Sequence, residues 1–163
     1  MNLVEGVLHA SEAGLEITFG GHTLSLDPGL VTDRPALQRY VDRQVIVGVR
    51  PGDLEDAALY PDAPTDRRLK TTVELREDMG AEILVHFTVD APPVAKEEVK
   101  QLAVDRGEVE DPADLAQSER STFIASFDAD STAAEGDRIE VLVDTRALQF
   151  FDPETSVSIW QDQ

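Results

Sequence analysis

Short segments of alternating apolar and polar residues, separated by glycine and proline turns, make up most of this 163-residue chain. Aromatic residues are only 6% of the sequence, so Val, Ile and Leu supply most of the apolar positions. Alternation of period two puts every second side chain on one face of a strand, whereas an amphipathic helix needs a period near 3.6. Many short strands at fairly even spacing favour an all-β barrel or sandwich over βαβ units.

The predicted strands lie on both flanks of the chain. The first three form an expected meander that turns at 11–14 and again at the glycine pair Gly20-Gly21. Proline-rich residues 59–68 are expected to form a loop. The segments predicted as strands are 4–10, 15–19, 22–26, 45–50, 69–78, 81–90, 121–130 and 137–145, followed by the apolar tail 146–159 with its turn at Asp152-Pro153.

One short helix is expected near residues 33–42, where the apolar spacing changes. Thr32 or Asp33 can cap it, and Pro35 suits its first turn. Apolar side chains then recur at i, i+3 and i+4 on one face, which is the spacing of an amphipathic helix.

The spacing of apolar residues changes a second time between residues 91 and 120. Pro92-Pro93 interrupts the strand pattern, and apolar residues then return at helical spacing within an acidic stretch. Asp111-Pro112 resembles a cap followed by proline in the first turn of another short helix. We therefore expect a small helical insertion near 94–120 in an otherwise β protein.

The charge balance and cysteine content restrict the possible environments. The formal net charge is −19, from 33 acidic and 14 basic residues, and such a surface repels nucleic-acid phosphates. The absence of cysteine excludes disulfides and thiolate metal sites. No apolar stretch is long enough for a membrane-spanning helix and no signal-peptide pattern is present, so we expect a cytoplasmic protein.

Catalytic and cofactor-binding motifs are absent from the sequence. It contains neither GxxxxGK[ST] nor a GxGxxG after a strand, and no GxSxG nucleophile elbow. His9, His22 and His86 lie in different predicted strands without metal-ligand spacing, so we expect them to be solvated or at the core edge, with His22 exposed. The acidic stretch 128–137 lacks the calcium-loop pattern and is expected to be a hairpin turn. We predict no catalytic, cofactor or metal site.

Four motifs nevertheless occur in a specific order: MNLVEG at the start, VGVRPGDL, VELREDMGAEILVHF, and finally LQFFDPETSVSI. This series resembles the C-terminal regulatory domain, of the OB/MOP-like TOBE type, of the ATP-binding subunits of carbohydrate-importing ABC transporters. The group includes the maltose, glycerol-phosphate and trehalose importers. Its members begin this domain near a Met-Asn pair and carry patterns similar to GIRPE, VExLG and LHLFDPxTG.

The resemblance implies a fold and a role for the whole chain. It implies one regulatory domain over 1–163, an OB-like or MOP-like β-barrel of two interleaved lobes, with the insertion at about 91–120. Such domains pair about the transporter's twofold axis and hold two ATPase subunits together. ATP and Mg would bind in a nucleotide-binding domain absent from this chain, so this polypeptide would not be an enzyme.

The resemblance also implies partners and a location. The partners would be a second copy of the ATPase subunit, the membrane subunits through the parent protein, and a cytoplasmic regulatory protein. The domain would lie at the cytoplasmic face of the membrane.

Three residues depart from the family patterns. Gly52 replaces a glutamate, Gln149 replaces a histidine, and Ser156 stands where the last turn usually has glycine. The last departure predicts that a serine adopts a backbone conformation that glycine takes more easily.

The candidate contact residues are Arg50, Phe150, Phe151 and Asp152. Pro51 restricts Arg50 to an extended conformation, from which its guanidinium can reach a carboxylate such as that of Asp53 or Asp152. Adjacent strand residues point to opposite faces, so only one of the two phenylalanines is expected to be available for a contact.

Two other functions are consistent with a small β-barrel. It could bind an oxyanion such as molybdate or sulfate, which requires converging N–H groups or cations. It could also be an OB-fold oligonucleotide binder, which requires aromatic platforms and a basic groove, and both are scarce in this sequence.

Overall fold

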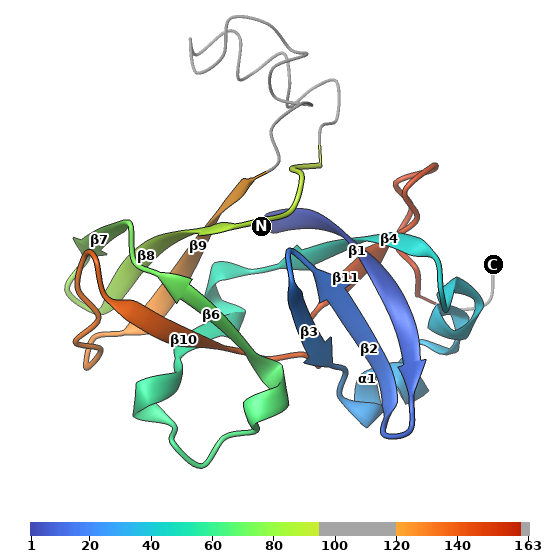
Figure 1. Cartoon of the computed structure of the whole chain (residues 1–163), viewed down its shortest axis with the longest axis horizontal. Coiled ribbons are helices and arrows are strands. Elements are labelled where there is room, and N and C mark those ends of the chain that lie inside the picture. Colours follow the sequence, from blue (N-terminus) through green and yellow to red (C-terminus); the bar gives the residue numbers. More distant parts are fainter. Residues whose placement is uncertain (95–119, 161–163) are drawn as a thin grey trace, which may run out of the picture.

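The computed structural model describes residues 1–94 and 120–160, which form three antiparallel sheets (Figure 1). The predicted all-β class is confirmed, and nearly every predicted strand exists. The expected helical insertion at 94–120 falls almost entirely in 95–119, which lie outside the described residues.

The first lobe is a five-stranded sheet in the order β11-β4-β1-β2-β3. Its strands are β1 (Asn2–Ser11), β2 (Gly14–Phe19), β3 (His22–Ser25), β4 (Gln44–Val49) and β11 (Gln149–Phe151). Consecutive strands β1, β2 and β3 pair as neighbours, so the predicted meander is confirmed. Gly20 and Gly21 form its second turn with φ of 54° and 78°, a conformation that glycine adopts without steric cost.

The second lobe contains two three-stranded sheets, β5-β10-β6 and β7-β8-β9. Their strands are β5 (Leu54–Asp56), β6 (Arg68–Thr72), β7 (Leu75–Asp78), β8 (Glu82–Val89), β9 (Ser121–Asp128) and β10 (Arg138–Val143). The two long strands alternate as the sequence pattern requires: β8 buries every second side chain from Ile83 to Val89, and β9 does the same from Ser121 to Phe127.

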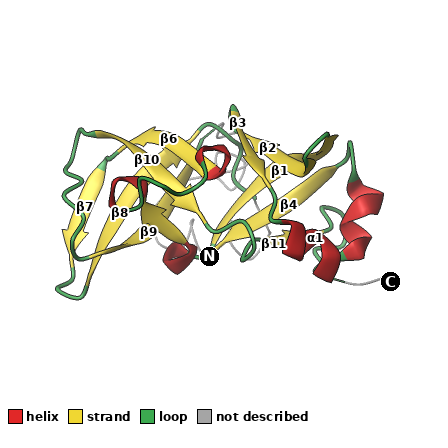
Figure 2. Ribbon diagram, turned by 90° about the horizontal axis from the view of Figure 1, so that it is seen from below, coloured by secondary structure: helices red, strands yellow, loops and turns green. Residues whose placement is uncertain are grey.

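The two lobes are interleaved along the chain. The chain leaves the first lobe after β4, builds the second lobe from β5 to β10, and returns so that β11 pairs with β4. Figure 2 shows the lobes side by side, with α1 at the far end of the five-stranded sheet. The predicted barrel of two interleaved lobes is thus confirmed.

Asn2 links the two lobes through its side-chain amide. Its Nδ2 donates to the Ile124 carbonyl and its Oδ1 accepts from the Ile124 N–H, both at 2.9 Å. The amide therefore satisfies both main-chain groups of one β9 residue, as a neighbouring strand would. This gives the asparagine of the opening motif a structural role.

The short helix predicted near 33–42 is present as a 3-10 helix, and an α-helix that was not predicted precedes it. The α-helix α1 (Pro28–Asp33) begins earlier and is capped by Asp27, whose Oδ1 accepts from the Gly29 N–H at 2.8 Å. The 3-10 helix η1 (Pro35–Tyr40) follows. Pro35 forces Arg34 out of the helical region, to φ −130° and ψ 68°, and this break ends α1.

The strand predicted at 69–78 is also divided, into β6 and β7. Val73 lies between them, where its N–H donates to the Asp137 carbonyl and its carbonyl accepts from Gly136. These bonds turn the chain from one sheet into the next. Strand β5 was not predicted, because three residues are too few to display an alternation.

Short 3-10 turns complete the connections of the second lobe. They are η2 (Pro51–Asp53), η3 (Ala57–Leu59) and η4 (Thr65–Arg67). The stretch 128–137 joins β9 to β10, which belong to different sheets, so it is not the hairpin turn that the sequence suggested.

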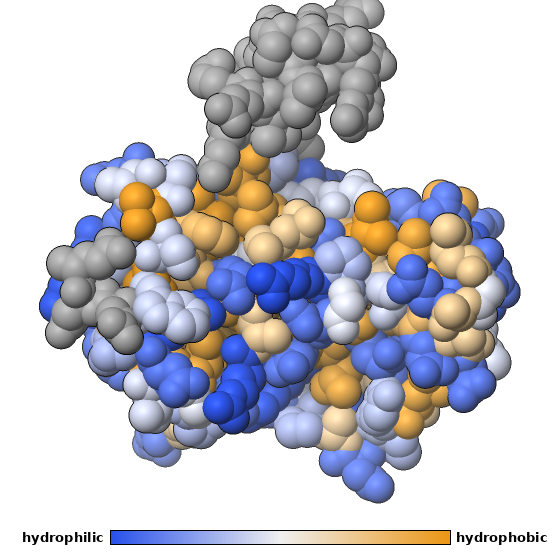
Figure 3. Space-filling view, turned by 180° about the vertical axis from the view of Figure 1, so that it is seen from behind, coloured by the Kyte–Doolittle hydropathy of each residue, from blue (hydrophilic) through white to orange (hydrophobic). Residues whose placement is uncertain are grey.

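One continuous apolar core extends through both lobes. Phe123 joins them, with its ring centroid 6.3 Å from that of Phe19 and 5.7 Å from that of Phe87. Burial of each such ring stabilises the fold by about 1.5–3 kcal/mol. Seen from behind in Figure 3, polar residues cover much of the surface and small apolar patches lie between them.

Candidate functional site

The closing motif forms a tight turn after β11. Asp152 organises it, because its Oδ1 accepts from the backbone N–H groups of Glu154 at 2.8 Å and Thr155 at 3.0 Å. The main chain then returns along β11, and Ile159 donates to the Phe150 carbonyl at 2.9 Å. The turn predicted at Asp152-Pro153 is thus confirmed.

Ser156 occupies the position of the family's glycine, and its φ is 60°. Its N–H donates to the Asp152 carbonyl at 2.8 Å, and this hydrogen bond of the turn holds Ser156 in the left-handed conformation. The conformation expected of this serine is confirmed. A Cβ at positive φ is strained, so the turn carries a local cost.

Tyr40, at the end of η1, attaches this turn to the rest of the first lobe. Its hydroxyl donates to Asp152 Oδ2 at 2.7 Å. This hydrogen bond is the main cause that lowers the pKa of Asp152, with further lowering by the Thr155 and Glu154 N–H groups. The same bond is the main cause that raises the pKa of Tyr40.

The four predicted contact residues lie in different environments. Phe150 is fully buried in the core, whereas Phe151 and Asp152 are partly exposed and Arg50 is exposed. Phe150 and Phe151 therefore point to opposite faces of the sheet, as neighbours in a strand must. Phe151 is the phenylalanine that a partner can reach.

Arg50 and Asp152 are too far apart to form an ion pair. Phe151 pairs with Ile46 in the β4–β11 register, so Asp152 lies beside the start of β4 while Arg50 follows its end. The separation of five residues corresponds to about 16 Å. The sequence-based choice of Asp152 as a partner for Arg50 is therefore wrong.

Asp53 is the other suggested partner of Arg50, but Arg50 is not the main influence on the pKa of this carboxyl group. Burial is the main cause that raises the pKa of Asp53, and Asp144 raises it further, while Arg50 opposes the shift. Within residues 1–94 and 120–160, no hydrogen bond or ion pair joins Arg50 to a carboxylate. Its guanidinium is thus available on the surface.

An apolar patch covers the outer face of the first lobe around Gly48. A Cβ at position 48 would lie 2.5 Å from Met1 Sδ, 3.2 Å from Leu3 Cδ2 and 3.3 Å from Phe151 Cε2. Three side chains from β11 and the start of the chain therefore converge over this glycine. We call Met1, Leu3 and Phe151 the outer patch; Met1 is 56% exposed.

Sequence reasoning missed Met1 and Leu3 as members of this surface. Gly48 pairs with Leu3 on one side and with Gln149 on the other, and paired residues share one face of the sheet. Met1 and Phe151 are each two residues away from these pairs, so they lie on the same face. This face depends on the order of three strands that are distant in the sequence. The glycine in the middle of the apolar strand was the only local signal for it.

Arg34 is a second residue that sequence reasoning missed. It is 4% exposed, and its Nη1 donates to the Leu148 carbonyl at 3.1 Å. Its guanidinium lies 4.3 Å from the ring centroid of Trp160, and burial lowers its pKa. Arg34 thus fixes the junction of α1 and η1 to β11 and to the C-terminal segment.

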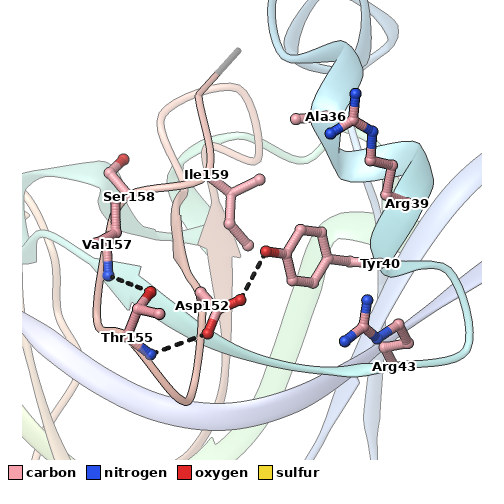
Figure 4. Close-up of a pocket in the computed structure, with 9 residues that line it drawn as sticks. All are labelled: Ala36, Arg39, Tyr40, Arg43, Asp152, Thr155, Val157, Ser158 and Ile159. Atoms are coloured by element: carbon pink, nitrogen blue, oxygen red, sulfur yellow. Dashed lines mark hydrogen bonds between the residues drawn. The ribbon is translucent and has the colours of Figure 1, made fainter. Parts of the chain in front are cut away.

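A groove of about 410 Å³ separates η1 from the segment that returns after the closing turn (Figure 4). Tyr40 and Asp152 meet at one side of it, and Arg39 and Arg43 extend from the η1 side. Val157, Ser158 and Ile159 form the opposite side, and Ala36 and Thr155 complete the lining.

The histidines do not form a site. His9 Nδ1 lies 3.6 Å from Asp42 and His86 Nε2 lies 3.3 Å from Glu77, which are separate surface pairs. His22 is partly buried against Phe19, contrary to the expected exposure, and this burial lowers its pKa. No three His, Asp or Glu side chains converge to hold a metal ion in the part of the chain that the structure describes.

The helices of the described segments have six residues at most, far fewer than a bilayer crossing requires.

Comparison with known proteins finds a family model and several ATP-binding proteins that are similar to this chain. Residues 1–54 match the family described as the MalK OB fold domain. Trehalose import ATP-binding protein SugC of Mycobacterium tuberculosis is 32% identical over 149 residues, which are 90% of this chain and 35% of that protein. Trehalose/maltose import ATP-binding protein MalK of Thermococcus litoralis is 29% identical over 161 residues, 98% of this chain and 34% of that protein.

A third relative, oligosaccharides import ATP-binding protein MsmX of Bacillus subtilis, is 23% identical over 157 residues, 96% of this chain and 32% of that protein. The chain thus spans about a third of the length of the curated relatives it matches.

Proposed function

We propose that the chain is an OB-fold domain of the kind that carbohydrate-importing ABC transporter ATPase subunits carry C-terminally, and that it joins two such subunits and regulates them. It carries out no chemistry of its own in this proposal. The role is mechanical: one domain from each subunit forms a fixed contact while the nucleotide sites open and close.

The extent of the similarity is the observation that carries the proposal. It covers 90% of this chain but only 35% of an ATP-binding protein, and this chain has no phosphate-binding loop. ATP and Mg therefore bind, in our proposal, in the nucleotide-binding domain of a longer parent protein. Its further partners are the membrane subunits and a cytoplasmic regulatory protein, and its place is the cytoplasmic face of the membrane.

The outer patch is the contact surface that we propose. A twofold contact places the same patch on both copies, so it must be self-complementary. An apolar centre meets this requirement, since two copies of Met1, Leu3 and Phe151 can pack without placing like charges together. Arg50 and Asp152 then lie at the rim, and Phe150 supports the patch from the core.

Site-directed cross-linking tests this contact, because the chain contains no natural cysteine. We expect Phe151→Cys to give a covalent dimer with a short bis-maleimide reagent, since an isologous contact brings the two copies of position 151 together. Ser11→Cys, at the end of β1 next to the turn into β2, is the matched control and should remain monomeric. Equal cross-linking of both variants, or none with Phe151→Cys, would contradict the proposal.

Calorimetric titration separates this function from its two rivals. We expect no heat of binding from molybdate or from single-stranded DNA. A saturable signal from molybdate would support the oxyanion-binding barrel instead, and one from DNA would support an oligonucleotide binder.

A further inference from the structure

A pocket of about 340 Å³ lies where the two lobes join, and it shares no residue with the outer patch or with the groove in Figure 4. The 3-10 helix η2, which follows β4, forms one side of it, and the end of β10 forms another. Residues between η3 and β6 complete the lining. We call it the junction pocket. Ligand sites occur preferentially at such junctions between structural units.

Asp53, at the end of η2, brings an unpaired carboxyl group to the junction pocket. Its Oδ2 is buried, and no described residue donates a hydrogen bond to it. Burial is the main cause that raises the pKa of Asp53, and Asp144 raises it further. The terminal torsion of an aspartate is broad, so a small rotation turns this oxygen into the pocket. A donor from outside would therefore supply the hydrogen bond that the carboxylate lacks.

Asp144 places a second carboxyl group beside the first. Its N–H donates to the Asp53 carbonyl at 2.9 Å, which holds the two residues side by side. Its Oδ1 accepts from the Arg146 N–H at 3.1 Å, and in the described segments no ion pair involves Asp144. Two carboxylates this close oppose each other's ionisation, and a cation between them removes that cost.

The other charged side chains of the lining already have partners. Arg67 Nη1 lies 3.3 Å from Asp27 Oδ2, the residue that caps α1 in the first lobe. Glu55 accepts from the Asp128 N–H with both oxygens, at 3.0 and 3.2 Å. The lining as a whole has three carboxylates and one guanidinium, in a protein with a net charge of −19. The junction pocket therefore repels anions and attracts cations.

Tyr60 gives the junction pocket an aromatic wall. It is 47% exposed although it lines the pocket, and Pro64 and Val143 add apolar surface to the lining. A guanidinium group is planar, so it can stack on such a ring and still donate paired hydrogen bonds to a carboxylate at its edge. An ammonium group is a more strongly hydrated point charge and has no flat face to stack.

We propose that the junction pocket binds a guanidinium group, which pairs with Asp53 and Asp144 and stacks on Tyr60. The group can come from a small molecule or from an arginine side chain of a partner protein, and the chemistry of recognition is the same. Binding here is independent of the subunit contact through the outer patch, because the two surfaces share no residue. Loss of one therefore leaves the other in place.

A titration followed by amide NMR shifts tests the pocket directly. The probe is N-acetyl-arginine amide, whose only charge is its guanidinium group. Its matched control is N-acetyl-citrulline amide, which has a neutral urea group of the same shape. We expect saturable shifts of the Asp53, Tyr60 and Asp144 amides with the arginine compound, and binding about tenfold weaker with the citrulline compound.

Asp53→Asn removes the unpaired charge and keeps the shape of the side chain. We expect it to weaken binding about tenfold while the thermal midpoint stays the same or rises, because the carboxylate has no partner to lose. Tyr60→Leu should weaken binding about threefold through loss of the stacked ring. Glu12→Gln, in the turn between β1 and β2, removes the same charge outside the pocket and should bind like the parent.

A capped Gly-Gly-Arg-Gly-Gly peptide identifies the source of the group. Tighter binding than that of the arginine compound would assign it to a protein segment, and equal or weaker binding would assign it to a small molecule; both outcomes support the pocket. No saturable shift at millimolar concentrations, equal binding of the citrulline compound, or unchanged binding by Asp53→Asn would overturn the proposal. Shifts spread evenly over the acidic surface would also overturn it, because they would show charge attraction alone.

Discussion

Asn2 holds the two lobes together through one side-chain amide, and its replacement measures that link. Asn2→Ala leaves both the N–H and the carbonyl of Ile124 without their partner. We expect a loss of about 1–3 kcal/mol in the free energy of unfolding, since these groups are partly shielded from water. Urea denaturation measures it, and a change within error would mean that water replaces the amide at no cost.

Ser156 is a residue at which the protein can be made more stable. Ser156→Gly relieves the strain of a Cβ at φ 60°, partly offset by the greater freedom of glycine in the unfolded chain. We expect a gain of about 0.5–1 kcal/mol in unfolding free energy. Ser156→Ala is the control, because it keeps the Cβ and should leave stability unchanged. A gain with alanine would assign the effect to the hydroxyl instead.

The hydrogen bond between Tyr40 and Asp152 predicts a specific pH dependence. The pKa of Asp152 is lowered from 3.8, so its contribution to stability is present above that value and is lost as the pH falls through the lower folded pKa. The pKa of Tyr40 is raised from 10.0, so its contribution is present below that value and is lost as the pH rises through the higher folded pKa.

Tyr40→Phe should therefore be less stable than the parent protein at neutral pH, and the difference should narrow at both extremes. Urea denaturation of the two proteins across the pH range measures this. A stability difference that stays constant with pH would show that the phenol acts only through packing.

At the scale of elements, Arg34 connects the helical junction to β11. Arg34→Met keeps much of the buried volume but removes the donor to Leu148 and the contact with Trp160. We expect a loss of about 1–3 kcal/mol in unfolding free energy, because a buried carbonyl loses a charged partner. A lower thermal midpoint accompanied by a change in Trp160 emission is the expected result, and an unchanged midpoint would contradict it.

The strand elements follow from local patterns, whereas their interruptions do not. Alternation located β1, β2, β8, β9 and β10 because each buries one face, whereas β4 was located as a continuous apolar run and is buried on both faces. The helix predicted near 33–42 is present as η1, but α1 was not predicted; Pro35 separates the two at Arg34, a residue held by a carbonyl 114 positions further along the chain. The break at Val73 likewise depends on the distant residues 136–137.

The contact surface could be predicted only in part for the same reason. The closing turn and the strained serine follow from the local motif around Asp152. The outer patch requires β1, β4 and β11 to be neighbours, and no local pattern specifies that order. The groove likewise joins η1 to a segment more than a hundred residues away, so its arginines could not be recognised from their spacing.

At the scale of the whole molecule, net charge opposes self-association. Two copies that each carry −19 repel one another, so added salt should screen the repulsion and strengthen self-association through the outer patch. Sedimentation at several salt concentrations measures this trend. Self-association that weakens as salt is added would contradict an apolar contact.

The central claim is that the outer patch pairs two copies of this domain. Sedimentation equilibrium over a wide concentration range tests it most directly, with Leu3→Asp as the variant and Arg138→Glu as the control. The account predicts a reversible monomer–dimer equilibrium that Leu3→Asp weakens strongly and Arg138→Glu leaves in place. A chain that stays monomeric at every concentration, or a Leu3→Asp variant that dimerises as tightly as the parent, would contradict it.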